Sequence, residues 1–140
     1  MVIIQKKLHL LSMIHQITKG IKISIQTKYK GPSYRNNRLY HFFGYAITIE
    51  NKSSETVKLT DRFWKIFDTL NNTEIVSGEG VVGQTPTLKP KETYTYGSGC
   101  YLESNMGAMK GFYTMINLDT FEQFKVIIPT FQLTTQTVLN

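Results

Sequence analysis

The stretch with the clearest chemical potential is the glycine-rich segment 78–83, whose spacing is G-x-G-x-x-G. That spacing occurs in dinucleotide-binding loops, where a strand precedes the glycines and a helix N-terminus follows them to hold the pyrophosphate. Here Pro86 and Pro90 follow the glycines, and two prolines so close together exclude a regular helix. The segment therefore has the glycines of a phosphate loop without the helix that such a loop needs.

Two interpretations of this loop stay open. In the structural one, it joins two strands, its glycines supply positive φ angles, and Val81 and Val82 plug the core. In the functional one, its backbone amides form a nest that binds a small anion or a nucleotide, such as pyrophosphate or a diadenosine polyphosphate, provided that the Glu79 carboxylate faces away. The residues of this candidate ligand site are Gly78, Gly80, Gly83 and Arg62.

Arg62 has two alternative roles that depend on its neighbour Trp64. Residues two apart share one face of a strand, so a core position for Trp64 would turn Arg62 inward, towards a buried acid or carbonyl. Alternatively, Arg62 lies at the strand end with its guanidinium free to grip an anion. Phe63 takes the opposite face in either case.

The net charge of +6 is unevenly distributed along the chain. Residues 1–49 hold eight basic and no acidic residues, whereas 50–140 hold eight basic and ten acidic ones. This asymmetry predicts an anionic partner, namely a protein with an acidic surface, unless the lysines merely line a solvated strand. Tyrosines lie among these basic residues, but no nucleic-acid-binding motif accompanies them, so nucleic acid is not the expected partner. The candidate partner surface comprises Lys22, Lys28, Lys30, Arg35 and Arg38.

Catalytic and metal-binding patterns are sparse. One cysteine, Cys100, and one histidine inside the expected domain, His41, do not make a transition-metal site of three or four N/S ligands. The sequence contains no H-E-x-x-H or C-x-x-C motif and no paired carboxylates, and Cys100 has no evident histidine partner. We therefore expect no enzymatic activity, no metal site and no cofactor.

Alternating side chains predict strands throughout the chain. Isoleucines alternate with polar residues over 21–30, and aromatic and aliphatic residues alternate with others over 41–51. Further strands are expected over 57–59, 62–68, 73–76, 93–96, 109–117, 122–128 and 131–137, separated by turn residues. Apart from a short helix within 3–17, no helical periodicity is expected. Many short strands predict an antiparallel β-sandwich of one domain.

The chain ends and the cell compartment yield three expectations. Residues 1–12 are interpreted as an N-terminal extension upstream of a natural start at Met13, with the domain over 13–140. No segment approaches the length of a membrane span, so no membrane partner is expected. The single cysteine excludes an internal disulfide, which favours a reducing cytoplasm.

Several ordered segments together resemble the ApaG family, also called CorD, from about Ile17 to Leu133. Residues 44–51 match the family's Y-x-I-x-I-x-N strand, and Phe63 stands where the family usually has histidine between arginine and tryptophan. Gly97 departs from the family's Y-T-S-G pattern, which follows Tyr96 here. The remaining matches are 78–86 (G-E-G-V-V-G-x-x-P), 106–113 (G-x-M-x-G-x-Y) and 128–131 (I-P-x-F).

The resemblance implies a fibronectin type III-like or immunoglobulin-like β-sandwich. It also implies a genetic link to divalent cation tolerance (cobalt, magnesium) and to a neighbouring diadenosine tetraphosphate hydrolase. Similar domains are appended to eukaryotic F-box and DNA-polymerase-delta-interacting proteins, and no catalytic residue set comes with the resemblance. The expected function is a non-enzymatic module that binds another protein, with a phosphate-containing small molecule as the alternative ligand.

Overall fold

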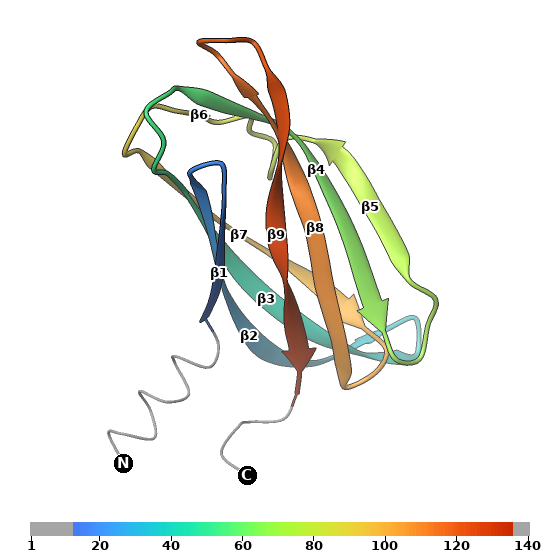
Figure 1. The fold of residues 1–140 in the computed structure, drawn as a ribbon. Coiled ribbons are helices and arrows are strands. Elements are labelled where there is room, and N and C mark those ends of the chain that lie inside the picture. The colour runs from blue at the N-terminus through green and yellow to red at the C-terminus, as the bar shows by residue number, and fades with distance from the viewer. Residues whose placement is uncertain (1–12, 136–140) are drawn as a thin grey trace, which may run out of the picture.

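The computed structural model describes residues 13–135, which form nine strands in two antiparallel sheets that pack face to face (Figure 1). Every regular element within that range is a strand. The predicted all-β antiparallel sandwich of the immunoglobulin and fibronectin type III kind is therefore confirmed. Alternating side chains explain it, since each sheet buries one face and leaves the other in water.

The first sheet has the spatial order β1–β2–β3–β7. Its strands are β1 (Met13–Thr18), β2 (Ile21–Arg35), β3 (Arg38–Asn51) and β7 (Thr93–Leu102). The long hairpin of β2 and β3 contains a bulge between Tyr29 and Gly31. On β3 the residues from Phe43 to Ile49 that alternate inward are buried, while Ala46 faces outward.

The second sheet has the spatial order β5–β4–β8–β9, with β6 paired to the start of β4. Its strands are β4 (Val57–Asp68), β5 (Glu74–Glu79), β6 (Thr87–Leu88), β8 (Met106–Asn117) and β9 (Gln123–Thr134). β4 pairs with both β5 and β8, so it lies in the middle of the sheet. The glycine-rich segment begins with the last two residues of β5, Gly78 and Glu79, and continues beyond the strand.

The core between the sheets is built from the inward residues of both layers. Trp64 is 3% exposed, and its ring contacts Phe131 at 5.9 Å and Tyr45 at 5.7 Å between ring centroids. Tyr45 comes from the first sheet, whereas the other two come from the second. Trp64 is therefore a core residue, and this fixes the inward side of β4.

Several expected element boundaries were wrong. Residues 57–59 and 62–68 belong to one strand, β4, which has a bulge near Thr60. Similarly, β9 continues through Pro129, and its pairing with β8 has a bulge between Met109 and Gly111. β7 extends well beyond Tyr96. The helix expected within 3–17 is also wrong for its described part, because β1 pairs with β2. In β7 and β9, long-range pairing outweighs the local glycine or proline signal.

The two long sides of the sandwich differ. On one side β1 lies beside β9, and the backbone amide of Ile127 donates to the Thr18 hydroxyl at 3.2 Å (Figure 1). On the other side lie the edge strands β7 and β5, one from each sheet. A cavity lies between these two edges, and it is described below as the edge pocket.

The expected N-terminal extension over residues 1–12 lies outside the described residues, as does the end of the expected domain beyond residue 135. Among residues 13–135 no helix is long and apolar enough to cross a membrane.

Candidate functional site

The glycine-rich loop is closed by its own hydrogen bonds. The amide of Gly80 donates to the Thr60 carbonyl at 2.8 Å, and the backbones of Val81 and Gln84 bond to each other at 2.8 and 2.9 Å. Gly80 has a φ of 67°, and a Cβ there would lie 2.3 Å from the Gln84 carbonyl oxygen. Glycine is therefore required at this position, both for the backbone angle and for the close approach.

The two loop valines have different environments. Val81 is 1% exposed and plugs the core as expected. Val82 is 63% exposed and has a φ of 47°, so the expectation that it also enters the core was wrong. The turn places it at the tip, because the chain must reverse between Val81 and Gln84 to form their paired hydrogen bonds.

Arg62 turns inward and binds the glycine-rich loop. It lies opposite Tyr113 in the sheet, on the face that carries Trp64, and its Nη1 donates to the carbonyl oxygens of Glu79 at 2.9 Å and Gly80 at 3.0 Å. The inward alternative, with carbonyl acceptors, is thus the one that the structure shows. Glu79 pairs with Asp61, so its side chain lies on the opposite face from Arg62.

Of the four residues in the candidate ligand site, the structure brings Arg62 next to Gly78 and Gly80. A Cβ on Gly78 would lie 3.1–3.3 Å from the guanidinium atoms, so the glycine leaves room for the arginine to lie across β5. Gly83, with a φ of 76°, has no atom within 4 Å of a Cβ position and lies in the open part of the turn. Because Gly80 uses its amide on Thr60, a phosphate would have to use other donors.

The edge pocket is a cavity of about 340 Å³ between β7 and β5. Its apolar lining includes Trp64, Val76 and Met109, and its polar lining includes Arg62 and Ser98. Burial raises the pKa of the Tyr45 hydroxyl in this pocket, while the Ser98 hydroxyl and then the Arg62 charge counteract part of the rise. The pocket thus has one cationic group in a mainly apolar wall.

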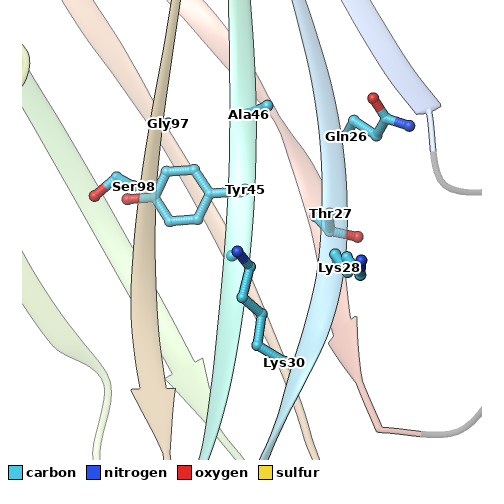
Figure 2. A pocket seen from close by; sticks show the side chains of 9 residues that line it. Gln26, Thr27, Lys28, Lys30, Tyr45, Ala46, Gly97 and Ser98 are labelled. Carbon is cyan, nitrogen blue, oxygen red and sulfur yellow. The ribbon is translucent and has the colours of Figure 1, made fainter.

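The second hollow is a shallow trough of about 660 Å³ on the outer face of the first sheet (Figure 2). Small residues form its floor, namely Gly44, Ala46 and Gly97. Figure 2 shows the Lys30 side chain extending from β2 across β3, and its Cε lies 2.6 Å from where a Gly44 Cβ would be. Lys28 lines the same trough, and no carboxylate does.

The five basic residues of the candidate partner surface have different surroundings. Lys28 and Lys30 line the trough, whereas Lys22 lies opposite Glu50 on the same face of the sheet. Arg35 lies over the Tyr101 ring at 4.5 Å. The remaining one, Arg38, forms an ion pair of 2.8 Å with Glu103.

Comparisons with known proteins match both the sequence and the fold. The ApaG domain model matches residues 32–117, a range that includes Arg62, the glycine-rich loop and β7. The chain is 43% identical over 122 residues to the ApaG protein of Shewanella sediminis, covering 86% of this chain and 95% of that protein. The chain belongs to the ApaG family.

Other relatives agree. The ApaG protein of Brucella canis is 39% identical over 121 residues, covering 86% of this chain and 92% of the relative. A crystal structure of a structural-genomics target has a TM-score of 0.79 at 37% identity, covering 86% of this chain and 90% of that one. A structure described as an ApaA protein of Bordetella pertussis has a TM-score of 0.75 at 31% identity, with 86% and 94% covered.

One surface of this ApaG domain escaped the sequence analysis. On the outer face of the second sheet, Phe63 and Phe112 stack with centroids 4.9 Å apart, and Lys125 lies 4.5 Å from the Phe112 centroid. Lys65 and Lys110 lie directly opposite each other, an arrangement of like charges that normally destabilises a sheet. Alternation along β4 is enough to place Phe63 and Lys65 on one face. Only the pairing of β4 with β8 shows that Phe112 and Lys110 lie beside them.

The Cys100 thiol and the His41 ring are the remaining groups of the ApaG domain that could act in catalysis. Burial raises the pKa of the Cys100 thiol to about 12, and the carboxylates of Glu74 and Asp68 add to the rise. A thiol with that pKa is almost entirely protonated at neutral pH and is a poor nucleophile. His41 Nδ1 and the Tyr29 hydroxyl are 2.8 Å apart, which gives this histidine a hydrogen-bond partner. Within residues 13–135 no three His, Cys, Asp or Glu side chains group as metal ligands do.

Proposed function

We propose that this member of the ApaG family is a non-enzymatic module that binds an acidic segment of another protein in the trough of the first sheet. One observation carries the proposal: two lysines, Lys28 and Lys30, line a hollow that contains no carboxylate. Neither lysine forms an ion pair with a described residue. An anionic partner would supply the missing countercharges.

The floor of the trough favours a protein as the partner. Because Ala46 and Gly97 project little or no side chain, a polypeptide can approach the sheet closely there. The exposed Lys30 side chain lies over Gly44, which places its ammonium group above the sheet. Complementary charges of this kind give an interface specificity and speed of association.

We also propose that the protein acts in the cytoplasm without catalysing a reaction. The surroundings of Cys100 and His41 favour a binding role over a catalytic one. A cytoplasmic location fits the single cysteine, which is free and buried. An effect on divalent cation tolerance would then pass through the bound partner rather than through a metal site of this chain.

Reversing the trough charges tests the proposal. We expect Lys28→Glu combined with Lys30→Glu to weaken binding of a fluorescent glutamate-rich peptide by about tenfold or more at low salt, since two favourable charge contacts become repulsive. Fluorescence anisotropy measures the affinity. The interaction should also weaken as salt rises from about 50 to 300 mM, because exposed charges are screened.

The matched control changes the net charge equally but outside the trough. Lys52 and Lys89 are exposed and do not line it. Lys52→Glu with Lys89→Glu should leave the affinity within about twofold of the wild type, because distant exposed charges are screened. Equal losses in both double variants would show that the peptide responds to net charge alone, which would contradict the trough as the site.

A second proposal is a phosphate-containing small molecule at the glycine-rich loop. It is supported by the Arg62 guanidinium, which lies against this loop and forms no ion pair with a described carboxylate. We expect pyrophosphate and diadenosine tetraphosphate, added at millimolar concentration, to shift the NMR signals of the loop amides. Unchanged signals for Gly78, Gly80 and Gly83 would rule this site out.

A further inference from the structure

Within residues 13–135, the outer edge of β7 has no paired strand and carries none of the charges, prolines or bulges that normally protect a strand edge. One side of β7 pairs with β3, and no other strand within residues 13–135 pairs with its opposite side. Its ten residues include no charged side chain and no proline, and its pairing with β3 shows no bulge. Natural proteins usually protect such an edge with charges, prolines, bulges or a covering segment.

The other edges of the sandwich are short or covered. β1 packs beside β9, as the contact of Thr18 with Ile127 shows. β5 has six residues and begins and ends with a glutamate. The unprotected edge of β7 is therefore a specific feature of this side of the molecule.

The edge pocket lies along the inner side of this edge. Ser98 and Cys100 of β7 line it, and so does Arg62 from the opposite sheet. A guanidinium has five N–H donors, and the two loop carbonyls occupy only Nη1. The remaining N–H donors of the guanidinium can bind a carboxylate, and arginine–carboxylate hydrogen bonds are among the strong ones. This pocket is therefore suited to a carboxylate.

Strand geometry connects the free edge with the arginine. A segment that adds to β7 would continue the first sheet and direct alternate side chains towards the second sheet. The neighbour of Arg62 on β5 is Gly78, which has no side chain to cover the guanidinium. An inward side chain of the added strand would therefore reach the cationic wall of the pocket.

We infer that an extended segment of a partner protein pairs with the free edge of β7 and inserts an aspartate or glutamate side chain beside Arg62. This inference rests on the proposed protein-binding function but places the segment at the edge and inner side of the first sheet, whereas the trough lies on its outer face, although Tyr45 and Ser98 line both hollows. A second copy of this chain that paired through its own β7 lacks the required group, because residues 93–102 contain no acidic side chain. The added segment contributes backbone hydrogen bonds for affinity and the carboxylate for specificity.

Selection of random dodecapeptides on the wild-type protein tests the inference without a known partner. We expect enriched peptides to combine β-branched residues with one acidic residue and to protect the amides of residues 93–102 from hydrogen exchange. Trp64 is the only tryptophan of the chain and lines the edge pocket, so its fluorescence should change on binding. Peptides that leave these amides unprotected would overturn the inference.

A double-mutant cycle isolates the carboxylate contact. Replacing the acidic residue of the peptide by its amide should weaken binding to the wild type about tenfold or more, since a charge-assisted hydrogen bond is lost. For binding to the Arg62→Gln variant, the same peptide change should alter the affinity less than about twofold. The carboxylate has then already lost its arginine partner, and the difference between the two proteins gives the energy of that pair. Equal losses on both proteins would overturn the inference, and the peptide replacement remains informative even where Arg62→Gln folds poorly.

Three further measurements distinguish a peptide at the edge of β7 from a peptide in the trough, a small anion or a second copy of this chain. Lys28→Glu with Lys30→Glu should leave peptide affinity within about twofold, because both lysines belong to β2, which β3 separates from β7, and distant exposed charges are screened. A loss of binding there would assign the peptide to the trough. Displacement of the peptide by millimolar pyrophosphate together with indifference to its acidic residue would identify a small-anion site instead. Concentration-dependent dimers that protect β7 without peptide would identify a second copy as the occupant.

Discussion

Replacing Gly111 by alanine should lower the free energy of unfolding by about 3 kcal/mol or more, at the upper end of the cost of overpacking. A Cβ at this position would lie 1.9 Å from the carbonyl oxygen of Phe63 and 3.1 Å from the Cα of Trp64. Both are backbone atoms of β4, so a side-chain rotation cannot relieve the clash. The β4–β8 pairing beside the core tryptophan must therefore separate.

The measurement is equilibrium unfolding in denaturant, followed through the Trp64 fluorescence. Thermal unfolding should show a decrease in Tm of about 10 °C for a domain of this size. Gly97→Ala is the matched control, because its Cβ would have only the Tyr45 carbonyl oxygen within 4 Å, at 3.8 Å. We expect a change within about 0.5 kcal/mol for this variant. Equal losses for the two variants would show that glycine-to-alanine substitution itself, rather than the contact with β4, sets the cost.

The second large effect is expected at Asn51, a fully buried polar residue at the end of β3. Its Nδ2 donates to the carbonyls of Glu55 at 2.8 Å and Leu88 at 2.9 Å, and its Oδ1 accepts from the Ser53 amide at 3.0 Å and hydroxyl at 2.6 Å. All the hydrogen bonds of this amide therefore hold the turn after β3 and the short strand β6 against the sandwich.

Asn51→Ala should destabilise the protein by about 3 kcal/mol, since each buried group left without a partner costs roughly 1–3 kcal/mol. Asn51→Asp should be at least as damaging, because a carboxylate would face the two carbonyl acceptors. The measurement is the denaturant concentration at the midpoint of unfolding, which reports stability when the dependence of the unfolding free energy on denaturant (the m-value) is unchanged.

The control for Asn51 is Asn71→Ala, which removes the same side chain from the exposed turn after β4. Asn71 bonds there to the Glu103 carboxylate, and the expected loss is below about 1 kcal/mol. A small loss for Asn51→Ala, similar to that for Asn71→Ala, would mean that water replaces the buried amide, which contradicts its role as a structural link.

Asn51 also explains part of the family motif. In Y-x-I-x-I-x-N the alternating tyrosine and isoleucines are the inward residues of β3, and Tyr45 contacts the Trp64 ring. The terminal asparagine continues the same alternation but uses its buried position for hydrogen bonds. The motif is therefore explained by the core and its closing turn, without a ligand.

The glycine-rich loop illustrates how a motif gains its meaning from structure. Its spacing first resembles a phosphate loop, and the following prolines remove the helix that such a loop needs. The structure adds that the Gly80 amide and one end of Arg62 serve the loop's own closure. Arg62 also lines the edge pocket, and the two loop carbonyls occupy only its Nη1.

The sequence by itself determined the strand pattern, the antiparallel sandwich, the ApaG resemblance and the shared face of Arg62 and Trp64. These follow from local information, because side chains alternate with a period of two and residues two apart share a face. The core position of Trp64 then fixes the side on which Arg62 lies. The same local logic failed at Pro129 and after Tyr96, where strands continue through residues that usually interrupt them.

Only the tertiary structure decided which distant residues meet. It paired Arg38 with Glu103, placed Lys30 over Gly44 and set Lys65 opposite Lys110. It also gave Arg62 the loop carbonyls as acceptors and left the edge of β7 free. The physical reason is that alternation specifies the face of each side chain, but strand order and register are set by packing of the whole core, which no local pattern records.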